Sequence, residues 1–464
     1  MGKEKTSPIN RRKFLVQSGL GVAGATAGLW LSQVLSCSPQ KQKPNILILM
    51  ADDAGWHDVG YHGSEIKTPN IDKLTKEGVV LNHFYVYPTC SPTRASLLTG
   101  RPPSRFGILG PIGGRSKHAL PKDTLTLPAL LRQNGYNTSI TGKWHLGLRP
   151  EVGPRKYGFD YSYGYFHGQI DQYTHHYKNG DRSWHRNDQY VDEEGHATDL
   201  ITNEAIKFIK EIRDKSKPFF LYVPFSVPHY PLQEDEKWIE PYKESIQNES
   251  RRLYAASVTH MDDAIGKILS ALDQENLAEN TLVIFLSDNG GQEAWTSHGE
   301  YNDRFGPYDR LGDNRPLRDW KGSLYEGGIR VPAVMRWTGK LKPGTIDGVI
   351  SVNDIYPTIA HIAGVSIPAE AHVEGVDVWP ALTGKGAVPE RILYWRTPRQ
   401  IAVRKGPWKL IHFGATPTEG RNELYNVVDD PEEKQDQAAQ HPDIVEELFK
   451  ILKAQFARDE TPGE

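Results

Sequence analysis

Cys90, Pro92 and Arg94 stand at every second position at the start of a short stretch that has a helical pattern. A cysteine at such a position is often a buried structural thiol, because a proline in the first turn of a helix costs no hydrogen bond. The chain of 464 residues has one other cysteine, Cys37, so a disulfide framework is absent. Cys90 therefore needs an explanation of its own, either as a buried thiol or as a reactive group.

Acidic side chains follow two apolar runs that are far apart in the sequence. Residues 45–50 and 281–286 are continuous apolar runs, as expected of strands that are buried on both faces. The residues that follow these runs include Asp52, Asp53, Asp288 and Asn289. Ligands of open α/β sheets bind outside the carboxyl ends of the strands, so the two ends predict one shared site. An all-oxygen set suits Ca²⁺ or Mg²⁺, whereas a single acidic pair would more often be a helix cap or a turn.

Two further stretches carry lysine and histidine near the ends of predicted strands. Lys143 and His145 are two residues apart, and on extended backbone such side chains project to the same side. His229 follows the apolar run 219–224 and lies between two prolines, which restrict the backbone. Histidine is suited to proton transfer near neutral pH, although a lone histidine in such a turn is usually structural. Lys143, His145 and His229 become candidates for catalysis only because the cysteine stretch and the acidic strand ends accompany them.

The order of the remaining patterns predicts an α/β protein. Apolar runs indicate further strands, and apolar residues at helical spacing alternate with them. The additional predicted strands span 79–85, 138–141, 219–223 and 329–337, and the predicted helices span 201–212, 261–272 and 355–362. Such alternation favours a mostly parallel or mixed central sheet that is covered by helices.

The C-terminal part has a different pattern. Short turn-separated runs favour an antiparallel sheet followed by a closing helix that carries Ile444, Leu448, Leu452 and Phe456. The predicted strands span 391–395, 400–404, 408–413 and 423–427. We therefore expect a large catalytic domain over 44–387 and a small α+β domain with a four-stranded antiparallel sheet over 388–464.

Two segments, 161–184 and 292–318, have little regular pattern and are rich in aromatic residues, histidine and arginine. Long loops of this kind often recognise ligands, and aromatic faces and arginines suit sugars and anions. The alternative is a pair of solvated loops that pack on their own aromatic residues. The candidate substrate-binding residues are His167, His298, Arg304, Arg310 and Arg315.

The N-terminal region has the features of an export signal. Arg11 and Arg12 precede the weakly apolar run 16–35, which resembles a twin-arginine signal, and the alternative is a membrane anchor. Four glycines make that run a poor membrane span. The residues before Cys37 resemble a lipobox, so a lipid anchor at Cys37 is one expectation, with 38–43 as a tether. Residues 1–37 therefore predict export to the periplasm or cell surface, and a net charge of −3 argues against nucleic acid as a partner.

Four motifs occur in the order found in type I sulfatases, and the resemblance covers nearly the whole chain after Asn45. The motifs are Cys90-Ser91-Pro92-Thr93-Arg94, Gly142-Lys143-Trp144-His145-Leu146-Gly147, the histidine turn at His229, and Lys321 followed by Glu326-Gly327-Gly328-Ile329-Arg330-Val331-Pro332. The resemblance implies an alkaline-phosphatase-like large domain, with Cys90 converted to formylglycine by a formylglycine-generating or sulfatase-maturating enzyme.

The same resemblance implies a role for each site residue. The hydrated formylglycine at Cys90 would attack the sulfur of a sulfate ester, while Arg94 and Lys143 stabilise that group. His145 would take a proton so that inorganic sulfate is released. His229, helped by Lys321, would protonate the departing alcohol. Asp52, Asp53, Asp288 and Asn289, together with Cys90, would bind calcium, with magnesium as the alternative.

Residues 52–63 and the strand end at 290–292 look most like the arylsulfatase B group, which acts on 4-sulfated N-acetylgalactosamine. The expected function is therefore that of an exported, calcium-dependent sulfatase acting on a sulfated saccharide. A phosphatase or phosphodiesterase of the same superfamily could share the acidic strand ends but would need a Ser or Thr nucleophile. A silent glycan-binding relative could retain the fold and the aromatic loops.

Overall fold

The computed structural model describes residues 1–2 and 42–460. The chain divides into the units 1–43 and 44–464, and all the elements described below belong to the second unit. The predicted export signal and Cys37 lie outside the described residues. In the described part, no helix combines the length and the hydropathy that crossing a membrane requires.

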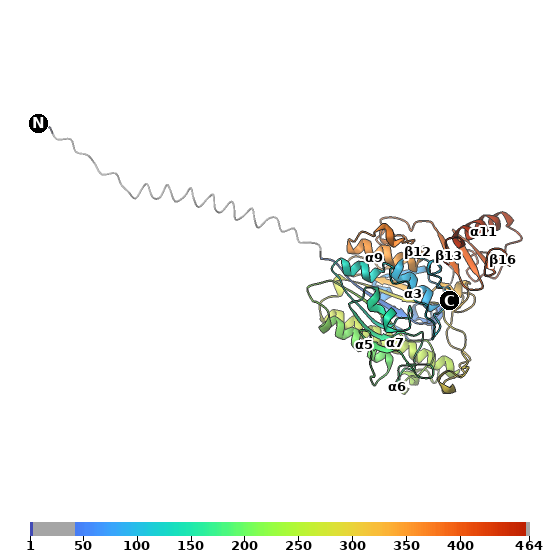
Figure 1. Cartoon of the computed structure of the whole chain (residues 1–464), viewed down its shortest axis with the longest axis horizontal. Helices are drawn as coiled ribbons and strands as arrows, with labels where there is room; N and C mark the ends of the chain where they lie inside the picture. The colour runs from blue at the N-terminus through green and yellow to red at the C-terminus, as the bar shows by residue number, and fades with distance from the viewer. Residues whose placement is uncertain (3–41, 461–464) are drawn as a thin grey trace. The chain divides into compact units, whose positions relative to one another are not determined.

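A ten-stranded mixed sheet forms the centre of the second unit (Figure 1). Its strands, in spatial order, are β12 (Gly344–Ser351), β2 (Val79–Tyr85), β11 (Ala333–Arg336), β10 (Thr281–Ser287), β1 (Asn45–Ala51), β9 (Phe219–Pro224), β3 (Asn137–Lys143), β4 (Tyr161–Tyr165), β7 (Trp184–Arg186) and β8 (Gln189–Tyr190). Strands β10, β1, β9, β3 and β4 are parallel to one another, whereas β11 is antiparallel to both of its neighbours. The predicted α/β class with a mixed central sheet is confirmed.

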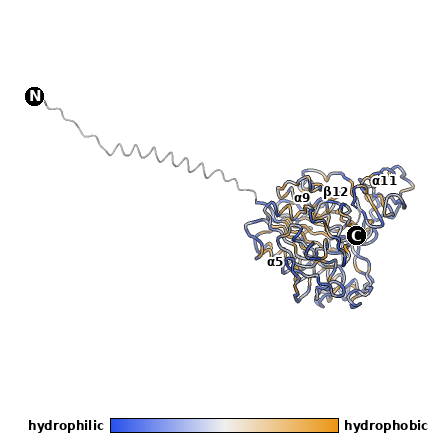
Figure 2. Tube along the Cα trace, in the orientation of Figure 1, coloured by the Kyte–Doolittle hydropathy of each residue, from blue (hydrophilic) through white to orange (hydrophobic). Residues whose placement is uncertain are grey.

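Helices cover both faces of the sheet because the central strands are apolar on both sides. Ile46, Ile48 and Met50 of β1 belong to one core, and Leu47 and Leu49 belong to another. The first core includes helices α3 (Cys90–Thr99), α4 (Leu127–Gln133) and α9 (Ile355–Ala363), and the second includes α2 (Pro69–Glu77), α5 (Ala197–Lys207) and α7 (Glu249–Gln274). Figure 2 shows the apolar segments concentrated in this interior. The carboxyl ends of the central strands, where the sequence predicts the site, are therefore held in place by a closely packed core.

The C-terminal sheet consists of β13 (Ile392–Arg396), β14 (Ile401–Lys405), β15 (Trp408–Phe413) and β16 (Arg421–Asn426), which are antiparallel throughout. One face packs on α11 (Pro442–Phe456) through Leu448 and Leu452. The other face contributes Ala402 and Ile411 to the core that contains β1 and α3. The predicted antiparallel sheet and closing helix are confirmed, and the sheet is buried on both sides.

The irregular segments contain more structure than their patterns predict. Residues 161–184 include β4 and the small hairpin of β5 (His176–Tyr177) and β6 (Asp181–Arg182), because tertiary packing buries aromatic residues such as Tyr165. The strand expected over 329–337 is shorter and follows α8 (Glu326–Ile329). The remaining short helices are α6 (Glu236–Ile239) and α10 (Trp379–Leu382), and helix α5 continues into a π-helical turn at Phe208–Ile212.

Candidate active site

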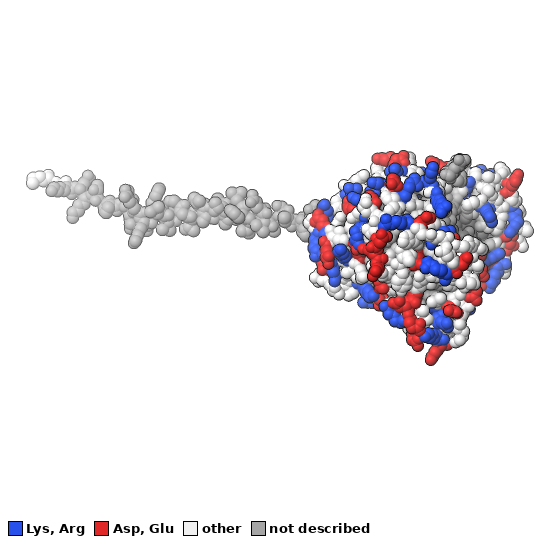
Figure 3. Space-filling model, turned by 60° about the horizontal axis from the view of Figure 1, so that its bottom comes forward, with Lys and Arg blue, Asp and Glu red and all other residues white. Residues whose placement is uncertain are grey.

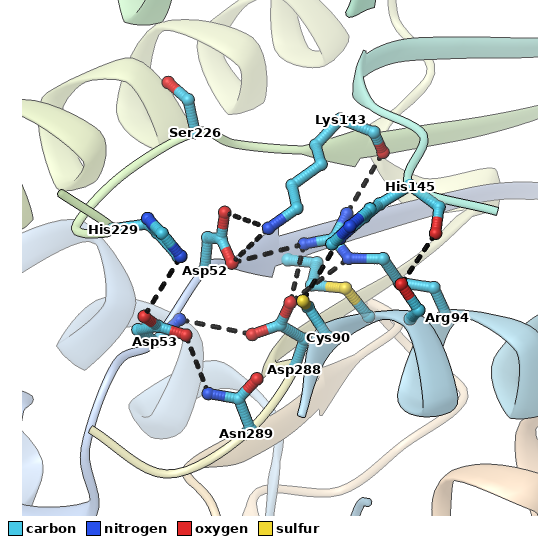
Figure 4. A network of polar contacts seen from close by, with 12 residues as sticks. Asp52, Asp53, Cys90, Arg94, Lys143, His145, Ser226, His229, Asp288 and Asn289 are labelled. Carbon is cyan, nitrogen blue, oxygen red and sulfur yellow. Dashed lines mark hydrogen bonds and ion pairs between the residues drawn. The ribbon is translucent and has the colours of Figure 1, made fainter. Parts of the chain in front are cut away.

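The acidic strand ends meet, as their sequence pattern predicts. Strands β1 and β10 are parallel neighbours with Ala51 opposite Ser287, so the residues that follow them lie side by side. The backbone N–H of Asp53 donates to Oδ1 of Asp288 at 3.2 Å, and Nδ2 of Asn289 donates to Oδ1 of Asp53 at 2.7 Å. Asp52, Asp53, Asp288 and Asn289 are all buried, as Figure 4 shows from close by.

Cys90 is the first residue of α3 and faces this cluster. Its Sγ lies 3.1 Å from Nδ1 of His145, and the side chain is almost completely buried. Burial raises the pKa of the Cys90 thiol, although Lys143 and Lys321 oppose the shift. As an unmodified cysteine, residue 90 is therefore a protonated thiol. A thiol is a much weaker nucleophile than a thiolate.

His145 is held with a free lone pair towards Cys90. Its Nε2 lies 3.1 Å from the carbonyl oxygen of Ile112, which can only accept, so Nε2 carries the proton. Burial, and then Lys143, lower the pKa of His145 well below its ordinary value. The neutral ring therefore presents Nδ1 as an acceptor to the side chain of residue 90, which is the arrangement that a general base requires.

The backbone around His145 differs from the prediction. Strand β3 ends at Lys143, and His145 has a φ of 54°, so the two side chains do not alternate along one extended strand. They reach the same site because a turn follows the strand. The turn is fixed from outside by Ser91, whose Oγ donates to the carbonyl of His145 at 2.8 Å.

Arg94 and Lys143 surround the carboxylates with positive charge. Arg94, one turn after Cys90, donates from Nη2 to Oδ2 of Asp288 at 2.7 Å and from Nη1 to the carbonyl of Lys143 at 3.0 Å. Nζ of Lys143 donates to both oxygens of Asp52 at 2.8 and 2.7 Å. Burial, opposed by Lys143 and reinforced by Asp288, raises the pKa of Asp52 to about 8. Burial and the neighbouring Asp288 thus both disfavour a charged Asp52, and an added cation would oppose both effects.

Lys321 and His229 approach the cluster from the side of Asp53. Nζ of Lys321 donates to Oδ2 of Asp53 at 2.7 Å, and Nε2 of His229 lies 3.7 Å from the same oxygen. Burial alone would raise the pKa of Asp53, but Lys321 and His229 hold it below its ordinary value. Nδ1 of His229 donates to the carbonyl of Tyr230 at 2.7 Å. Burial and Lys321 lower the pKa of His229, so His229 is neutral in the free site and Lys321 carries the positive charge beside Asp53.

The acidic residues fit a hard cation. Oδ1 of Asn289 is buried and has no hydrogen-bond partner among the described residues, which leaves an acceptor directed into the cluster. Asp52, Asp53 and His229 place ligand atoms within 4.8 Å of one another. His229 was not in the predicted ligand set, and its position next to Asp53 makes it an additional candidate. Oxygen donors dominate the set, which favours calcium or magnesium over zinc.

The predicted substrate residues have partners other than the acidic cluster or are exposed. His167 is buried, stacks on Tyr177 and has Nδ1 2.8 Å from Oγ of Ser183. Arg304 pairs with Asp171 at 3.0 Å, and Arg315 pairs with Asp313. His298 and Arg310 are exposed. None of the five has a hydrogen bond or ion pair to Asp52, Asp53, Cys90 or Asp288 in the described part of the chain, so their role stays a prediction.

Several residues that support the site were not singled out from the sequence. Asp58 accepts from the backbone N–H of Gly55 at 2.7 Å and from the hydroxyl of Tyr254 at 2.7 Å, and that hydroxyl also lies 2.8 Å from the carbonyl of Asp53. Gly168 lies against the ring of His145, since a Cβ there would come within 2.5 Å of Cε1. A glycine in an aromatic loop carries no signal of this contact in the sequence.

Comparison with known proteins gives the class. The family model described as sulfatase matches residues 44–365, and a model described as N-sulphoglucosamine sulphohydrolase, C-terminal, matches residues 319–460. The chain therefore belongs to the sulfatase family and is a sulfuric ester hydrolase.

Individual relatives agree with the family. Arylsulfatase J of Mus musculus is 32% identical over 90% of this chain and 77% of the relative, and N-acetylgalactosamine-6-sulfatase of Canis lupus familiaris is 32% identical over 86% and 74%. The crystal structure of Ps i-CgsB in complex with k-i-k-neocarrahexaose has 31% identity and a TM-score of 0.82, covering 91% of this chain and 94% of that one. The PsFucS1 sulfatase from Pseudoalteromonas sp. has 25% identity and a TM-score of 0.75 over 97% and 95%. These similarities support the sulfatase family and do not single out the arylsulfatase B group.

Proposed function

We propose that this chain is an exported, calcium-dependent sulfatase that hydrolyses sulfate esters of a sulfated saccharide with a formylglycine derived from Cys90. One observation carries the proposal. The side chain of Cys90 lies at the buried start of α3, with the acceptor nitrogen of His145 3.1 Å away and Arg94 and Lys143 on the adjacent carboxylates. A protonated thiol is a weak nucleophile even with these groups around it. The hydrate of formylglycine carries two hydroxyls in place of one sulfur.

The residues of the chain divide the work by charge and position. Arg94 and Lys143 supply fixed positive charge beside residue 90, where an incoming sulfate group needs it. His145 accepts a proton at Nδ1, because Nε2 is committed to the carbonyl of Ile112. Burial alone would lower the pKa of Lys321, but Asp53 raises it, so Lys321 keeps its proton and supplies positive charge towards the departing alcohol oxygen. His229, beside it, is the proposed proton donor to that oxygen. A sugar alcohol is a poor leaving group, so a proton donor matters more here than for an aryl ester.

The divalent cation would be held by Asp52, Asp53, Asp288 and Asn289, with His229 at its edge. When bound, such a cation supplies positive charge that polarises the sulfate group. Its positive charge would also offset the cost of burying the Asp52 carboxylate, which is the main reason that the pKa of Asp52 is raised.

Sulfated galactosaminoglycans and algal galactans are the leading substrates. N-acetylgalactosamine-6-sulfatase and a carrageenan oligosaccharide complex stand among the relatives and solved structures that resemble this chain. The segment 292–318 supports the same class, because Trp295 stacks on Tyr230, next to His229, with ring centroids 4.5 Å apart. Trp295 is buried, whereas Tyr230 is half-buried and offers part of an aromatic ring beside His229 to a sugar.

Mass spectrometry of the peptide that carries Cys90 tests the proposal, after expression with a formylglycine-generating enzyme. We expect the aldehyde or its hydrate at residue 90, and sulfate release from at least one glycan in a panel of galactosaminoglycans, carrageenans and ulvan. The Cys90→Ala variant is the matched control and should release none. An unmodified, alkylatable thiol together with no sulfate release from any glycan would overturn the proposal and favour a silent glycan-binding relative.

A further inference from the structure

Lys409 lies at the contact between the C-terminal sheet and the catalytic part of the chain. It belongs to β15, and its side chain projects to the same side as that of Ile411, two residues later. Ile411 packs into the core that contains β1 and α3, so this face of the C-terminal sheet is directed towards the catalytic sheet. The side chain of Lys409 is 0% exposed. A lysine buried to this degree needs partners for its charge.

The Lys409 ammonium has three oxygen neighbours, two as hydrogen-bond acceptors and the third, on Glu433, as an ion pair. Nζ lies 3.1 Å from the carbonyl oxygen of Leu324, 2.8 Å from Oε1 of Glu326 and 2.7 Å from Oε1 of Glu433. Two of its three donors therefore have hydrogen-bond acceptors, and two carboxylates balance its charge. A buried ion pair adds little net stability, but two anchored carboxylates around one ammonium restrict the geometry of the contact.

The two glutamates are anchored in turn. Oε2 of Glu433 accepts from the backbone N–H of Glu326 at 2.6 Å, and Oε2 of Glu326 accepts from the hydroxyl of Tyr85 at 2.6 Å. Arg404 of β14 donates to the same hydroxyl. The cluster therefore joins the C-terminal sheet and the segment before α11 to α8 and to β2.

The turn that this cluster holds carries Lys321 at its beginning. Residues 321–328 run from Lys321 through Leu324 and Glu326 into α8. Gly322 has a φ of 89°, and two more glycines follow in α8, so the turn has little stiffness of its own. Contacts from outside the turn must therefore define its position.

Backbone hydrogen bonds connect the same turn to both sides of the active site. On one side, the N–H of Lys321 donates to Gly291 at 3.1 Å, two residues after the metal-ligand candidate Asn289. On the other side, the N–H of Gly322 donates to Pro88 at 2.7 Å, two residues before Cys90. A displacement of the turn would therefore move the ammonium of Lys321 relative to residue 90.

We propose that Lys409 is a positioning residue of the active site, acting through Glu326 and Glu433 to hold the turn 321–328 so that Lys321 stays on Asp53. The inference rests on the proposed role of Lys321 in sulfate-ester hydrolysis. Lys409 touches neither Asp53 nor Cys90, so its effect on catalysis passes through the turn. Misplacement of a catalytic group by about 1 Å can cost on the order of 100-fold in rate.

A double-mutant cycle tests this inference. Lys409→Met keeps the length of the side chain and removes the ammonium, and Lys321→Ala removes the group that is positioned. We expect Lys409→Met to lower kcat/KM roughly 10- to 100-fold. In the Lys321→Ala background the same substitution should change kcat/KM by less than about 2-fold, because the positioned group is already absent. If the two losses multiply in the double variant, the inference is wrong.

Controls separate positioning from loss of folding and from failure of the proposed function. Lys405→Met on β14 removes an exposed lysine paired with Glu447 and should leave kcat/KM unchanged. If Lys409→Met does not fold, Glu433→Gln changes the same cluster. Its effect on kcat/KM should depend on Lys321 in the same way. The same double-mutant cycle can also be measured without turnover, by comparing the affinities of the four proteins for inorganic sulfate in calorimetry. Wild-type sulfate release, measured first, tests the proposed function by itself, and a cycle that is additive in an active enzyme overturns only the positioning role.

Discussion

Each ionisable side chain at the site has a partner that determines what it can do. Nε2 of His145 is occupied by the carbonyl of Ile112, which leaves Nδ1 for residue 90. Nδ1 of His229 is occupied in the same way by the carbonyl of Tyr230. The two histidines are therefore neutral acceptors in the free site, and the cations Arg94, Lys143 and Lys321 provide its positive charge.

Asp288 is the acidic residue whose removal should best reveal the cation. We expect millimolar calcium to raise the Tm of the wild-type chain relative to a chelator, because a ligand that binds only the folded state stabilises it. Asp288→Ala should abolish this shift and sulfate release together. Asp309→Ala, which removes an exposed acid bonded to Asn248, is the matched control and should keep both. Activity that survives both exhaustive chelation and Asp288→Ala would contradict the proposed ligand set.

At the scale of elements, parallel strands bring the chemistry together and helices hold the loops around it. Helix α7 carries His260, whose Nδ1 lies 2.8 Å from Oε2 of Glu234 and whose Nε2 lies 3.3 Å from Oδ1 of Asp199. Asp199 belongs to α5, and Glu234 follows His229 by five residues. His260 therefore connects α7 to α5 and to the loop of His229.

This connection predicts a pH dependence of stability. Burial alone would lower the pKa of His260, but Asp199 and Glu234 raise it to about 9. A pKa raised on folding contributes stability that is complete below about 6.5 and is lost as the pH rises through about 9. The contribution is on the order of 2–3 kcal/mol. The other groups that face His260 are His196 and Trp238, and Lys267 lies beside Asp199.

Urea unfolding at pH 6, 7.5 and 9 checks the size and the sign of this contribution. His260→Gln should be less stable than the wild type at pH 6, and the difference should shrink towards pH 9. The exposed His298→Gln is the control and should follow the wild type at every pH. A difference between wild type and His260→Gln that stays constant from pH 6 to 9 would show that the ion pairs do not contribute in this way.

At the scale of the whole molecule, the sulfatase match begins at residue 44, directly after the predicted signal and tether. The visible face in Figure 3 carries lysine and arginine interspersed with aspartate and glutamate, in keeping with a net charge of −3. A face of mixed charge gives the proposed glycan substrate little long-range attraction, so the proposal places recognition on cations inside the site.

Export is the remaining whole-molecule prediction and rests on the sequence alone. We propose that the twin-arginine signal carries the chain to the periplasm or cell surface. Replacing Arg11 and Arg12 by lysine should retain the protein in the cytoplasm, measured by fractionation, whereas Lys5→Gln should not. If Cys37 carries a lipid anchor, Cys37→Ala should move the protein from the membrane fraction to the soluble fraction. Unchanged export of the double-lysine variant would contradict the signal assignment.

The sequence by itself determined the class and the main elements, and it predicted which residues react. Apolar runs that end in Asp52 and Asp288 are local patterns, and burial on both faces is typical of strands in a parallel sheet, as β1 and β10 are. The cysteine motif is equally local, because its residues are covalent neighbours. Where the pattern was mixed, as over residues 161–184, the strand β4 could not be predicted, since only packing against β3 makes it regular.

Only the tertiary structure decided how the reactive residues are held. The turn at His145, the carbonyl of Ile112 that orients its ring, and the lone oxygen of Asn289 all depend on contacts between distant segments. Lys409 looks like an ordinary surface lysine in the sequence, yet it is buried among three oxygen atoms from two other segments. Such contacts carry no periodic signal, because they depend on where the folded chain returns and not on which residues are adjacent.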